Sequence, residues 1–402
     1  MQEFDVIIVG GGMVGASLAL AVSETVSGSG LRVAIVDRQS MTAEPVTPET
    51  SYAPRVSALT EASVELFRKL GAWRLMQEQR VCAYEHMQVW DGEGTGEIQF
   101  DADSTGYPAL GYIVENDVIR SALLQRLDET DIQLYPNQRK LRFHLDDDLR
   151  KVILENDEVL AAPLLVAADG AESTLRSAAA IPVSRKDYLH HAVVTTVITE
   201  KSHQNSARQV FLDTGPLAFL PLPDLNGRHC SSIVWSLVPE EAEQVMALSD
   251  EAFCQSLARA IEARLGNVIE ADARLCFPLQ QRHASQYHRS GVVLVGDAAH
   301  TIHPLAGQGV NLGLQDAIAL AEELLRAVAR EDDIATDHIL NRYQRRRKGS
   351  NLAMILTMEG FQNLFSQNDI GVRWLRNTGL KLTDRLPLIK QLLIKQAMGL
   401  NS

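Results

Sequence analysis

The chain has 402 residues, of which 46% are apolar and 22% charged, and its formal net charge at pH 7 is −13. A chain of this length is expected to fold as two domains rather than around one core. The negative charge argues against nucleic-acid binding, which requires a basic face. The four cysteines are widely spaced and form no C-x-x-C pair, so neither a zinc site nor a disulfide framework is expected.

No targeting segment or membrane span is expected either. An apolar strand pattern begins near Phe4 with no basic leader before it, so no signal peptide is predicted. No apolar run approaches the ~18 residues that would cross a bilayer. We therefore expect a cytoplasmic protein that meets a membrane, if at all, only from the side.

A strand, a glycine-rich turn and a helix open the chain. Asp5–Val9 is a short apolar strand pattern, Met13–Val22 reads as a helix rich in Ala and Leu, and Val33–Val36 is a second strand that ends at Asp37. Strand, helix and strand in about 30 residues are typical of a βαβ unit. The sequence therefore predicts a Rossmann-type domain at the N-terminus.

The turn between the first strand and the helix has the spacing G-x-G-x-x-G. Gly10 permits the tight bend, and Gly12 lets backbone N–H groups approach a pyrophosphate at the helix N-terminus. Gly15 allows the helix and the strand to pack closely. Asp37 follows Gly15 by 22 residues, where a carboxylate accepts hydrogen bonds from ribose hydroxyls. This turn predicts dinucleotide binding but does not distinguish NAD from FAD.

A second strand–turn–helix pattern lies near residue 300. The apolar strand Val292–Val295 ends in Gly296-Asp297, and Gly307–Asn311 opens a helical stretch. A carboxylate after a strand suits a ribityl chain, and the helix N-terminus directs its positive dipole at a flavin ring that becomes anionic on reduction. This pattern favours FAD. His300 and His303 are not expected to bind a metal because no Cys or carboxylate cluster accompanies them, and His300 is expected to pack beside the flavin loop.

Together with a third motif, these patterns resemble the class A flavin monooxygenases, the single-component aromatic hydroxylases. The third motif is Leu165–Gly170, followed by Ser173 and Arg176. In that family it lies beside the FAD pyrophosphate and the approach path of the nicotinamide. The resemblance implies an α/β fold like that of p-hydroxybenzoate hydroxylase. Such a fold has a Rossmann-type FAD-binding domain, an inserted antiparallel β-sheet substrate domain and a C-terminal helical extension.

The expected domains are discontinuous in the sequence. We assign residues 1–75, 105–185 and 285–340 to the FAD-binding domain, residues 76–104 and 186–284 to the substrate domain, and residues 341–402 to the helical C-terminal region. Within these domains, Arg55–Leu70 and Asn116–Leu127 are predicted to be helical, and residues 84–104 are predicted to form a β-meander.

Further segments resemble the ubiquinone-biosynthesis hydroxylases, with the 2-polyprenylphenol hydroxylases as the nearest branch. These segments are Arg55–Leu59, Ile113–Asn116, Ala218–Leu222, Gly379–Leu382 and Gln396–Leu400. The resemblance covers essentially the whole chain. It implies hydroxylation of the aromatic ring of a polyprenylated phenol, with O2, FAD, a flavin C4a-hydroperoxide as oxidant and NADH or NADPH as reductant. No metal is required.

Two other functions are left open. One is an FAD-dependent dehydrogenase or reductase of the same superfamily, which would insert no oxygen. The other is a flavin-bound assembly subunit of a lipid-modifying complex. No G-x-S-x-G signature supports a hydrolase. The ring carbon, the prenyl length, a homo-oligomeric state, membership of a ubiquinone-biosynthesis complex and the catalytic acid–base residues also stay open.

The candidate site residues follow from the motifs and from the resemblance. The resemblance makes Arg55 an FAD phosphate or ribityl contact and places Glu115 near the ribityl chain; the alternatives are an exposed helix-start arginine and a solvated carboxylate. The predicted cofactor contacts are Gly10, Gly12, Val14, Gly15, Asp37, Arg38, Arg55, Glu115, Asp169, Gly296, Asp297, Pro304, Gly307, Gly309, Val310 and Asn311. The candidates for the walls of the aromatic pocket are Phe219, Pro221, Pro304 and His303, although an apolar strand residue can equally belong to the core.

The C-terminal segment combines basic and apolar residues. Between Arg373 and Lys395 there are six basic residues and one acid, Asp384, among several leucines and isoleucines. A basic amphipathic helix binds an anionic membrane or a partner, and it can also pack on its own domain. We expect contact with a partner or with the inner membrane, because the rest of the chain is acidic and the expected substrate is a lipid.

Overall fold

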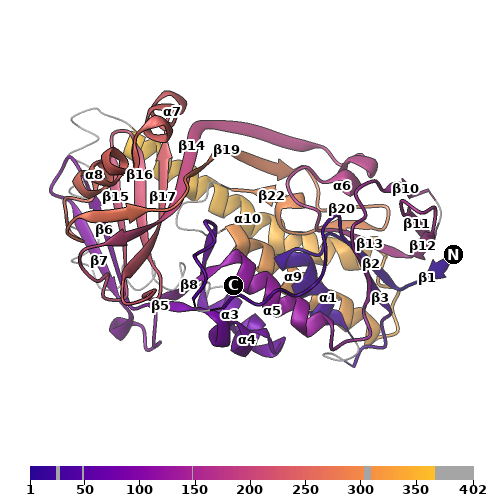
Figure 1. Ribbon diagram of the computed structural model, residues 1–402. Helices are drawn as coiled ribbons and strands as arrows, with labels where there is room; N and C mark the ends of the chain where they lie inside the picture. Colours follow the sequence, from indigo (N-terminus) through magenta and orange to yellow (C-terminus); the bar gives the residue numbers. More distant parts are fainter. Residues whose placement is uncertain (24–27, 48, 147, 303–308, 367–402) are drawn as a thin grey trace.

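The structure is a computed structural model that describes residues 1–23, 28–47, 49–146, 148–302 and 309–366. Figure 1 shows two layered units beside one another, one around a six-stranded sheet and one around a nine-stranded sheet. Long strands and the helix α10 (Asp337–Ser366) run across both. The expected α/β fold with an inserted β-rich domain is confirmed.

The six-stranded sheet is the core of the domain that is expected to bind the nucleotide, which we call the nucleotide-binding domain. In spatial order its strands are β20 (His288–Arg289), β21 (Val292–Leu294), β13 (Leu164–Ala167), β2 (Val6–Val9), β3 (Val33–Val36) and β9 (Gln133–Tyr135). All pairs are parallel except β20 with β21. Strands β2, β3, β13 and β21 are buried along their whole length, which explains why the sequence shows them as continuous apolar runs.

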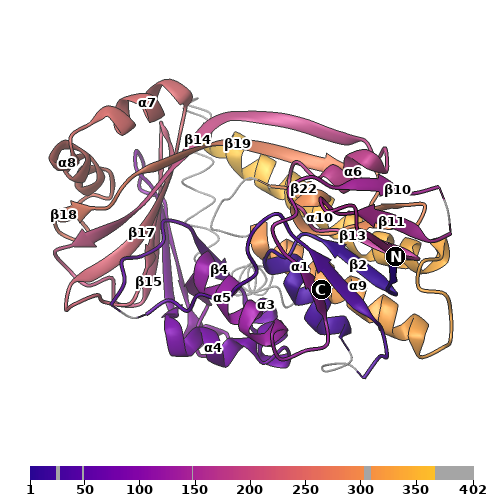
Figure 2. The ribbon, with the colours of Figure 1, turned by 45° about the vertical axis from the view of Figure 1, so that its right-hand side comes forward.

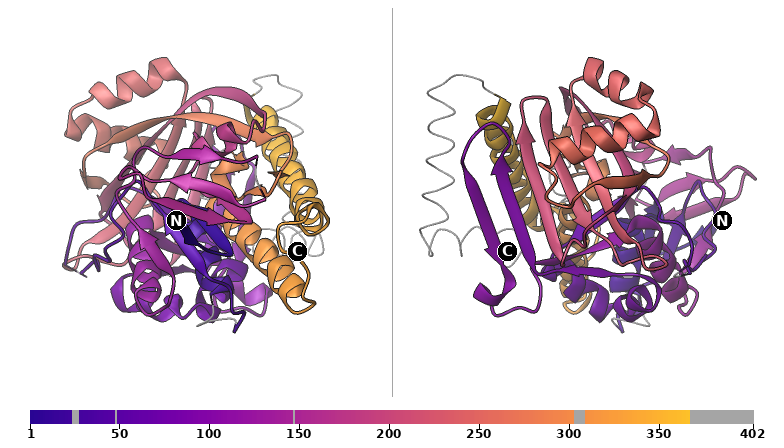
Figure 3. Two further views of the ribbon diagram at one scale, coloured as in Figure 1. Left: turned by 90° about the vertical axis from the view of Figure 1, so that its right-hand side faces the viewer. Right: turned by 60° about the vertical axis from the view of Figure 1, so that its left-hand side comes forward.

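Helices cover this sheet and form the rest of its core. Helix α1 (Met13–Val22) packs against α5 (Asn116–Leu127) and α9 (Gly309–Val328), and α10 packs along α9. The left view of Figure 3 shows α9 and α10 side by side. The bounds of α1 and α5 are those predicted. The boundary expected at residue 341 falls inside α10, which begins at Asp337.

The nine-stranded sheet belongs to the expected substrate domain. Its strands are β22 (His300–Thr301), β19 (Leu275–Ala284), β14 (Val183–Thr199), β17 (His229–Leu237), β16 (Gly215–Pro221), β15 (Ser206–Leu212), β6 (His86–Asp91) and β7 (Glu97–Asp101) in spatial order, with β18 (Val268–Ala271) paired to β14. All pairs are antiparallel except β15 with β6. Segments 86–101 and 183–284 therefore meet in one sheet.

The two faces of this sheet have different surroundings. Helices α7 (Pro239–Ala247) and α8 (Asp250–Ala260) cover the outer face, as Figure 2 shows. The opposite face packs against a three-stranded sheet of β4 (Val56–Leu59), β8 (Gly111–Glu115) and β5 (Cys82–Tyr84). This opposite face is directed towards the nucleotide-binding domain, and we call it the inner face.

The helix predicted over Arg55–Leu70 is wrong in its first part. Val56–Leu59 is strand β4, which pairs antiparallel with β8, and only Glu61–Lys69 forms a helix, α3. The side-chain oxygen of Thr60 accepts a hydrogen bond from the backbone N–H of Ser63 and begins that helix. Pairing with a strand more than 50 residues away outweighed the local helical pattern.

The remaining elements complete the periphery. A four-stranded sheet consists of β1 (Gln2–Glu3), β12 (Val159–Ala162), β11 (Arg150–Ile153) and β10 (Arg142–His144). Helix α4 is Ala72–Gln79, helix α6 is Thr174–Ala178, and the short 3₁₀ turns are Ala102–Ser104 and Gly296–Ala298. Among the helices that the structure describes, none is both long and apolar enough to cross a bilayer.

Candidate active site

Gly10 brings the first and third motifs into contact. Its backbone has φ +109°, and a Cβ at this position would overlap the carbonyl of Ala168 at the end of β13. The backbone N–H of Ala168 donates to the carbonyl of Val9 at 2.8 Å. The strands that precede the Gly10 turn and the Asp169-Gly170 turn therefore end side by side, at the carboxyl edge of the parallel sheet where ligands bind in such folds.

Gly15 and Gly12 are required for different reasons. A Cβ on Gly15 would overlap the carbonyl oxygen of Gly10, so only glycine lets α1 start this close to the turn. A Cβ on Gly12 would meet no protein atom within 4 Å. Gly12 is the N-cap of α1, which has no side-chain cap and no acidic residue in its first turn. The N–H groups of this helix end are thus available to an anion such as a pyrophosphate.

Val14 joins the first motif to the second. Its side chain lies against Gly296, and a Cβ on Gly313 of α9 would come within 2.7 Å of Val14 Cγ2. Glycine at both positions lets α1 and α9 approach each other at the end of β21. All three motifs, which are spread over almost 300 residues of sequence, therefore meet at one edge of the six-stranded sheet.

Asp37 lies beside the first turn, at the end of β3. Its Oδ2 accepts a hydrogen bond from the backbone N–H of Gly11 at 2.5 Å, and its Oδ1 accepts one from Gln39 at 2.7 Å. The carboxylate is half-buried, whereas the neighbouring Arg38 is exposed. The position of Asp37 next to Gly11 suits the ribose contact expected of it.

The third motif has one carboxylate oxygen without a partner. Asp169 Oδ2 accepts hydrogen bonds from the backbone N–H groups of Thr174 at 2.7 Å and Leu175 at 3.3 Å, at the start of α6. Asp169 Oδ1 is buried and has no hydrogen-bond partner among the described residues. Arg176 is also buried, and its Nη1 donates to the carbonyl of Ala298 at 2.9 Å, which ties this motif to the second.

Asp297 is the charged residue of the second motif. Its side chain reaches solvent, yet desolvation by the surrounding protein raises the pKa of its carboxyl, against the opposing effect of the charges of His300, Arg55 and Arg282. Arg55 is exposed and lies over the ring of Phe277, with its Cζ 5.8 Å from the centroid. Arg55 and Asp297 therefore belong to the same electrostatic environment.

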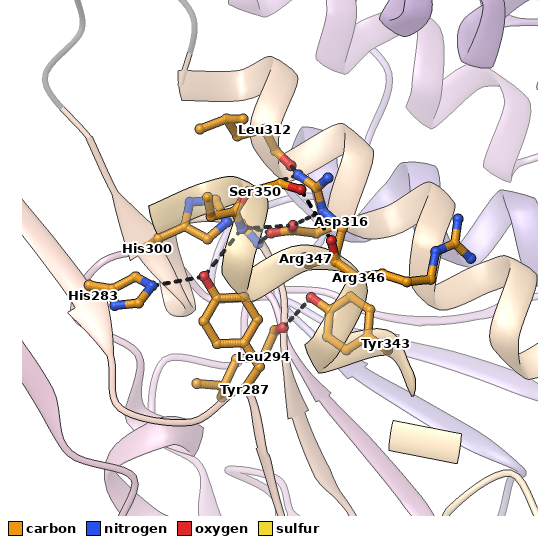
Figure 4. A network of polar contacts seen from close by, with 12 residues as sticks. His283, Tyr287, Leu294, His300, Leu312, Asp316, Tyr343, Arg346, Arg347 and Ser350 are labelled. Atoms are coloured by element: carbon orange, nitrogen blue, oxygen red, sulfur yellow. Dashed lines mark hydrogen bonds and ion pairs between the residues drawn. The ribbon is translucent and has the colours of Figure 1, made fainter. Parts of the chain in front are cut away.

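A network of buried polar groups stabilises the turn at Gly296 (Figure 4). Asp316 of α9 is fully buried, and its Oδ2 accepts a hydrogen bond from the backbone N–H of Gly296 at 3.1 Å. The same oxygen is 2.5 Å from His300 Nε2, and Oδ1 accepts from Arg347 Nε at 2.7 Å. His300 is thus a packed residue, as expected, and it pairs with a carboxylate.

Helix α10 completes this group of contacts, which we call the Asp316 network. Asn351 Nδ2 lies 3.2 Å from both Asp316 Oδ1 and the hydroxyl of Tyr287, and that hydroxyl is 3.1 Å from His283 Nε2. The hydroxyl of Tyr343 donates to the carbonyl of Leu294 at 2.7 Å. Among the described residues, no group of three or more His, Cys, Asp or Glu side chains is arranged to hold a metal ion.

The chain is similar in sequence to proteins of known function. Residues 3–356 match the family described as "FAD binding domain". The chain is 38% identical over 402 residues to a 3-demethoxyubiquinol 3-hydroxylase of Escherichia coli (strain K12), with 99% of each chain covered. It is 30% identical over 433 residues to the mitochondrial ubiquinone biosynthesis monooxygenase COQ6 of Homo sapiens, covering 96% of this chain and 91% of that protein.

The chain belongs to the ubiquinone-biosynthesis FAD-dependent monooxygenases. Its fold is that of solved flavin monooxygenases. The p-nitrophenol 4-monooxygenase PnpA of Pseudomonas putida DLL-E4 matches with a TM-score of 0.76 and 21% identity, covering 100% of this chain and 99% of that one. The prediction of an FAD-dependent aromatic hydroxylase of class A is therefore confirmed.

The site residues fit the FAD that this family binds. The open side of Gly12 at the N-terminus of α1 can admit a pyrophosphate. The partnerless Asp169 Oδ1 and the accessible carboxylate of Asp297 lie at the two neighbouring turns. Contacts of the individual residues with FAD stay predictions.

Glu115 is a buried carboxylate rather than the solvated one of the alternative. It is buried with Arg80, whose Nε is 2.9 Å from Glu115 Oε2 and whose Nη2 donates to Oε1 at 2.9 Å. Oε1 also accepts from the backbone N–H of Ala53 at 2.7 Å, and Arg80 Nη1 donates to the carbonyl of Thr50. The pair thus fastens the segment that leads to Arg55. Glu115 is not a solvated carboxylate, and Arg55 precedes a strand rather than a helix.

The N-terminus of α9 carries other predicted contacts. Asn311 is buried. Its Oδ1 accepts hydrogen bonds from the hydroxyl of Ser63 at 2.7 Å and from the backbone N–H of Thr60 at 3.0 Å, and its Nδ2 donates to the carbonyl of Ala58 at 2.7 Å. It therefore anchors α9 to the end of β4. Gly309 and Val310 lie at the start of α9. His303, Pro304 and Gly307 lie outside the described residues.

The structure corrects the expectation for Phe219. This side chain is buried between the nine-stranded sheet and α8, in contact with the core that contains Phe253. Side chains alternate along a strand, so Ala218 and Leu220 are the residues of β16 that lie on the inner face. Pro221 lies two residues after Phe219 on β16 and is therefore on the same side of the sheet as Phe219. Phe219 is therefore a core residue and not a wall of the pocket on the inner face.

Sequence reasoning missed the residues that support the motifs. Arg80, Asp316 and Arg347 are buried charges that hold site residues in place. Their identity was visible in the sequence, but the partners lie between 16 and 35 residues away and on different elements. Only Gly313 carried a usable signal, because it extends the glycine spacing of the second motif.

Proposed function

We propose that this enzyme hydroxylates the aromatic ring of a polyprenylated phenol in ubiquinone biosynthesis, with O2 as the oxygen donor and NADH or NADPH as the reductant. The observation that carries the proposal is the meeting of three FAD motifs at a sheet edge beside the inner face of the nine-stranded sheet. The relatives support the substrate class, because one acts by name on a demethoxyubiquinol, which is a prenylated hydroquinone.

Residues of the nucleotide-binding domain bind and orient the cofactor in this proposal. The N–H groups at the start of α1 hold the pyrophosphate, and the carboxylate of Asp37 accepts from the ribose. Asp297 and Arg55 face the remaining length of the cofactor. When bound, FAD supplies the redox chemistry that activates O2.

The inner face of the large sheet takes the substrate ring. Its described side chains are mainly apolar, including Ala207, Ala218 and Leu220. An apolar enclosure excludes water from the reacting atoms, which protects an oxygen-transfer reaction from side reactions.

Contact with a membrane or a partner is proposed for the basic C-terminal segment, which lies outside the described residues. The support is its charge, with six basic residues against one acid between Arg373 and Lys395. Binding of the full-length enzyme to anionic vesicles should fall when these six residues are replaced by glutamine. Binding that is unchanged would contradict the membrane role.

The test of the proposed reaction uses isotopically labelled O2. Purified enzyme loaded with FAD is incubated with NADH or NADPH and a short-chain prenylphenol or demethoxyubiquinol, and the product is analysed by mass spectrometry. One labelled oxygen atom on the ring is expected. Reductant consumption with unlabelled product would favour the dehydrogenase or reductase alternative.

A second measurement addresses the assembly-subunit alternative. The variant Asp297→Ala should bind FAD weakly and form no hydroxylated product, because it lacks the carboxylate at the second motif. A cell that depends on this chain and still makes the product with the Asp297→Ala variant would exclude the enzymatic role.

A further inference from the structure

The inner face of the nine-stranded sheet carries a buried amide. Along β15, Ala207 packs with the inner-face cluster and Val210 packs with the core under α8, so Gln209 shares the inner face with Ala207. The strand register confirms this position, because Gln209 lies directly opposite Ala218 of β16, another inner-face residue.

Within the part of the chain that the structure describes, the amide of Gln209 has no hydrogen-bond partner. The residue is only 7% exposed, no described group forms a hydrogen bond with its side chain, and the amide keeps a small contact with solvent. Buried amides are almost always hydrogen-bonded, because leaving water without a replacement partner costs free energy. The residue opposite it, Ala218, offers only a methyl group, and its neighbour in the parallel pair, Val89 of β6, is also apolar. A ligand is the partner that the surroundings leave open.

Two hydroxyls on the same face support this reading. Thr196 of β14 and Ser232 of β17 are directly opposite each other, and the side-chain oxygens of both are buried without a partner. Ser232 is paired with Leu220 of β16, and Gln209 is paired with Ala218, which lies two residues before Leu220 on the same strand. The two hydroxyls are therefore offset by two residues from Gln209 along the strand direction. Thr196 and Ser232 thus form a pair of hydroxyls on the same mainly apolar face, with β16 between Ser232 and Gln209.

We propose that Gln209 determines substrate specificity by hydrogen-bonding an oxygen substituent on the aromatic ring of the substrate. This inference rests on the proposed function and assigns the ring a polar contact on the sheet. An amide offers both a donor and an acceptor, so it can bind a hydroxyl or a methoxy oxygen. It is uncharged, which suits a neutral phenol or hydroquinone in a buried site.

The position of the Gln209 amide on the inner face affects which substrates the enzyme selects. A site that is built to hydrogen-bond a substrate oxygen rejects an analogue that lacks it, because the buried amide is then left unpaired. Selection by ring size alone is much weaker, since an apolar wall distinguishes poorly between similar groups. The enzyme is therefore expected to discriminate between prenylphenols by their ring oxygens.

The experiment combines one variant with two substrates. Gln209→Met keeps the length of the side chain and removes its hydrogen-bonding groups. The substrates are a pair of short-chain prenylphenols that differ by one ring oxygen, and kcat/KM for hydroxylation is measured for each. The wild type should prefer the oxygen-bearing substrate by roughly tenfold to a hundredfold, the range expected for leaving one buried amide unpaired, and Gln209→Met should lose this preference to within about threefold.

Controls separate this effect from a change of fold. FAD content and thermal unfolding should be the same in Gln209→Met and the wild type. Gln209→Asn keeps the amide and should retain part of the preference, which provides a second variant if the methionine packs poorly. Ser231→Ala removes an equally buried hydroxyl without a partner from the opposite face of β17 and should leave the preference unchanged.

The outcomes are distinguishable. A Gln209→Met enzyme that keeps the full wild-type preference would overturn the inference while leaving the proposed function intact. A wild type that hydroxylates neither substrate, although it binds FAD and oxidises the reductant, would overturn the proposed function and this inference with it.

Discussion

Two buried polar regions of the enzyme differ in how completely their groups are paired. In the Asp316 network, both carboxylate oxygens have partners on other elements, and Tyr287 and Asn351 extend the chain of contacts. On the inner face of the large sheet, Gln209, Thr196 and Ser232 have no described partner. Both regions are buried, so exposure alone does not distinguish them.

The difference separates support from recognition. A fully paired network has one arrangement and fixes the backbone around it, which suits a group beneath the Gly296 turn. A buried group without a protein partner is stable only at a cost, and that cost is recovered when a ligand binds. The Gly296 turn is thus held by the protein itself, whereas we infer that a ligand completes the contacts of the inner face.

The largest expected effect comes from breaking the paired region. Asp316→Ala leaves His300 and Arg347 buried without their counter-charge, and we expect the free energy of unfolding to fall by about 3–5 kcal/mol. Chemical denaturation of the FAD-free protein measures it. Glu322→Gln is the matched control, because Glu322 pairs with Arg346 at the surface, where the loss should stay below about 1 kcal/mol. Equal losses in the two variants would contradict the role of the network.

The glycine turn gives the next largest effect. Gly12→Ala places a methyl group where no protein atom lies within 4 Å, so stability should change little while FAD binding weakens by roughly tenfold to a hundredfold, or about 1.4–2.8 kcal/mol. Gly15→Ala is the comparison, since its methyl group would overlap the carbonyl of Gly10 and should destabilise the fold itself. Titration of the apoprotein with FAD and thermal unfolding without FAD test both. A Gly12→Ala protein with wild-type FAD affinity would refute the assignment.

The pH dependence of stability provides a third test. Burial alone would raise the pKa of Asp316, but the charges of His300 and Arg347 outweigh it and lower that pKa below its usual value. The folded state then favours the carboxylate, so its contribution to stability is complete above about pH 4, the unfolded value, and is lost as pH falls through the folded pKa. The wild type should lose stability below pH 4 more steeply than Asp316→Asn, by up to about 1.4 kcal/mol per pH unit. Stability curves of the wild type and Asp316→Asn that stay parallel below about pH 4 would contradict this contribution of Asp316.

The smallest effect concerns the two serines of β17. Ser232→Ala removes an inner-face hydroxyl and should raise KM for the prenylphenol by about threefold or less, since the loss of one weak contact is worth under about 1 kcal/mol. Ser231→Ala, on the α8 side, should leave KM unchanged. Neither variant should destabilise the protein, because neither hydroxyl has a described partner. An equal rise in both would argue against a substrate contact on the inner face.

Elements with strong local signals were predicted accurately. The bounds of α1 and α5 match the predicted helices, and β3 matches the predicted strand. The error over Arg55–Leu70 arose because Val56–Leu59 forms a strand only through its pairing with β8. Likewise, Phe219 was assigned to the pocket because an apolar strand segment does not reveal which face of the sheet is inner. A shift of one residue reverses every side chain.

The carboxylates show the same limit. Asp37 directly follows β3 and Asp297 lies in the turn just after β21, so their place at the sheet edge could be predicted from the chain. Glu115 is the last residue of β8, but Arg80, at the end of α4, pairs with it. Whether a carboxylate is available to a ligand depends on what approaches it in three dimensions.

The sequence by itself determined the three glycine turns, the FAD-type α/β fold and the family, because a tight turn between strand and helix depends on residues that are neighbours in the chain. Only the tertiary structure decided that Gly10, Val14 and Gly313 hold those turns together, that Asp316 secures one of them, and that Gln209 rather than Phe219 lies on the inner face. These are contacts between distant segments, set by strand register and helix packing, and no local pattern specifies them.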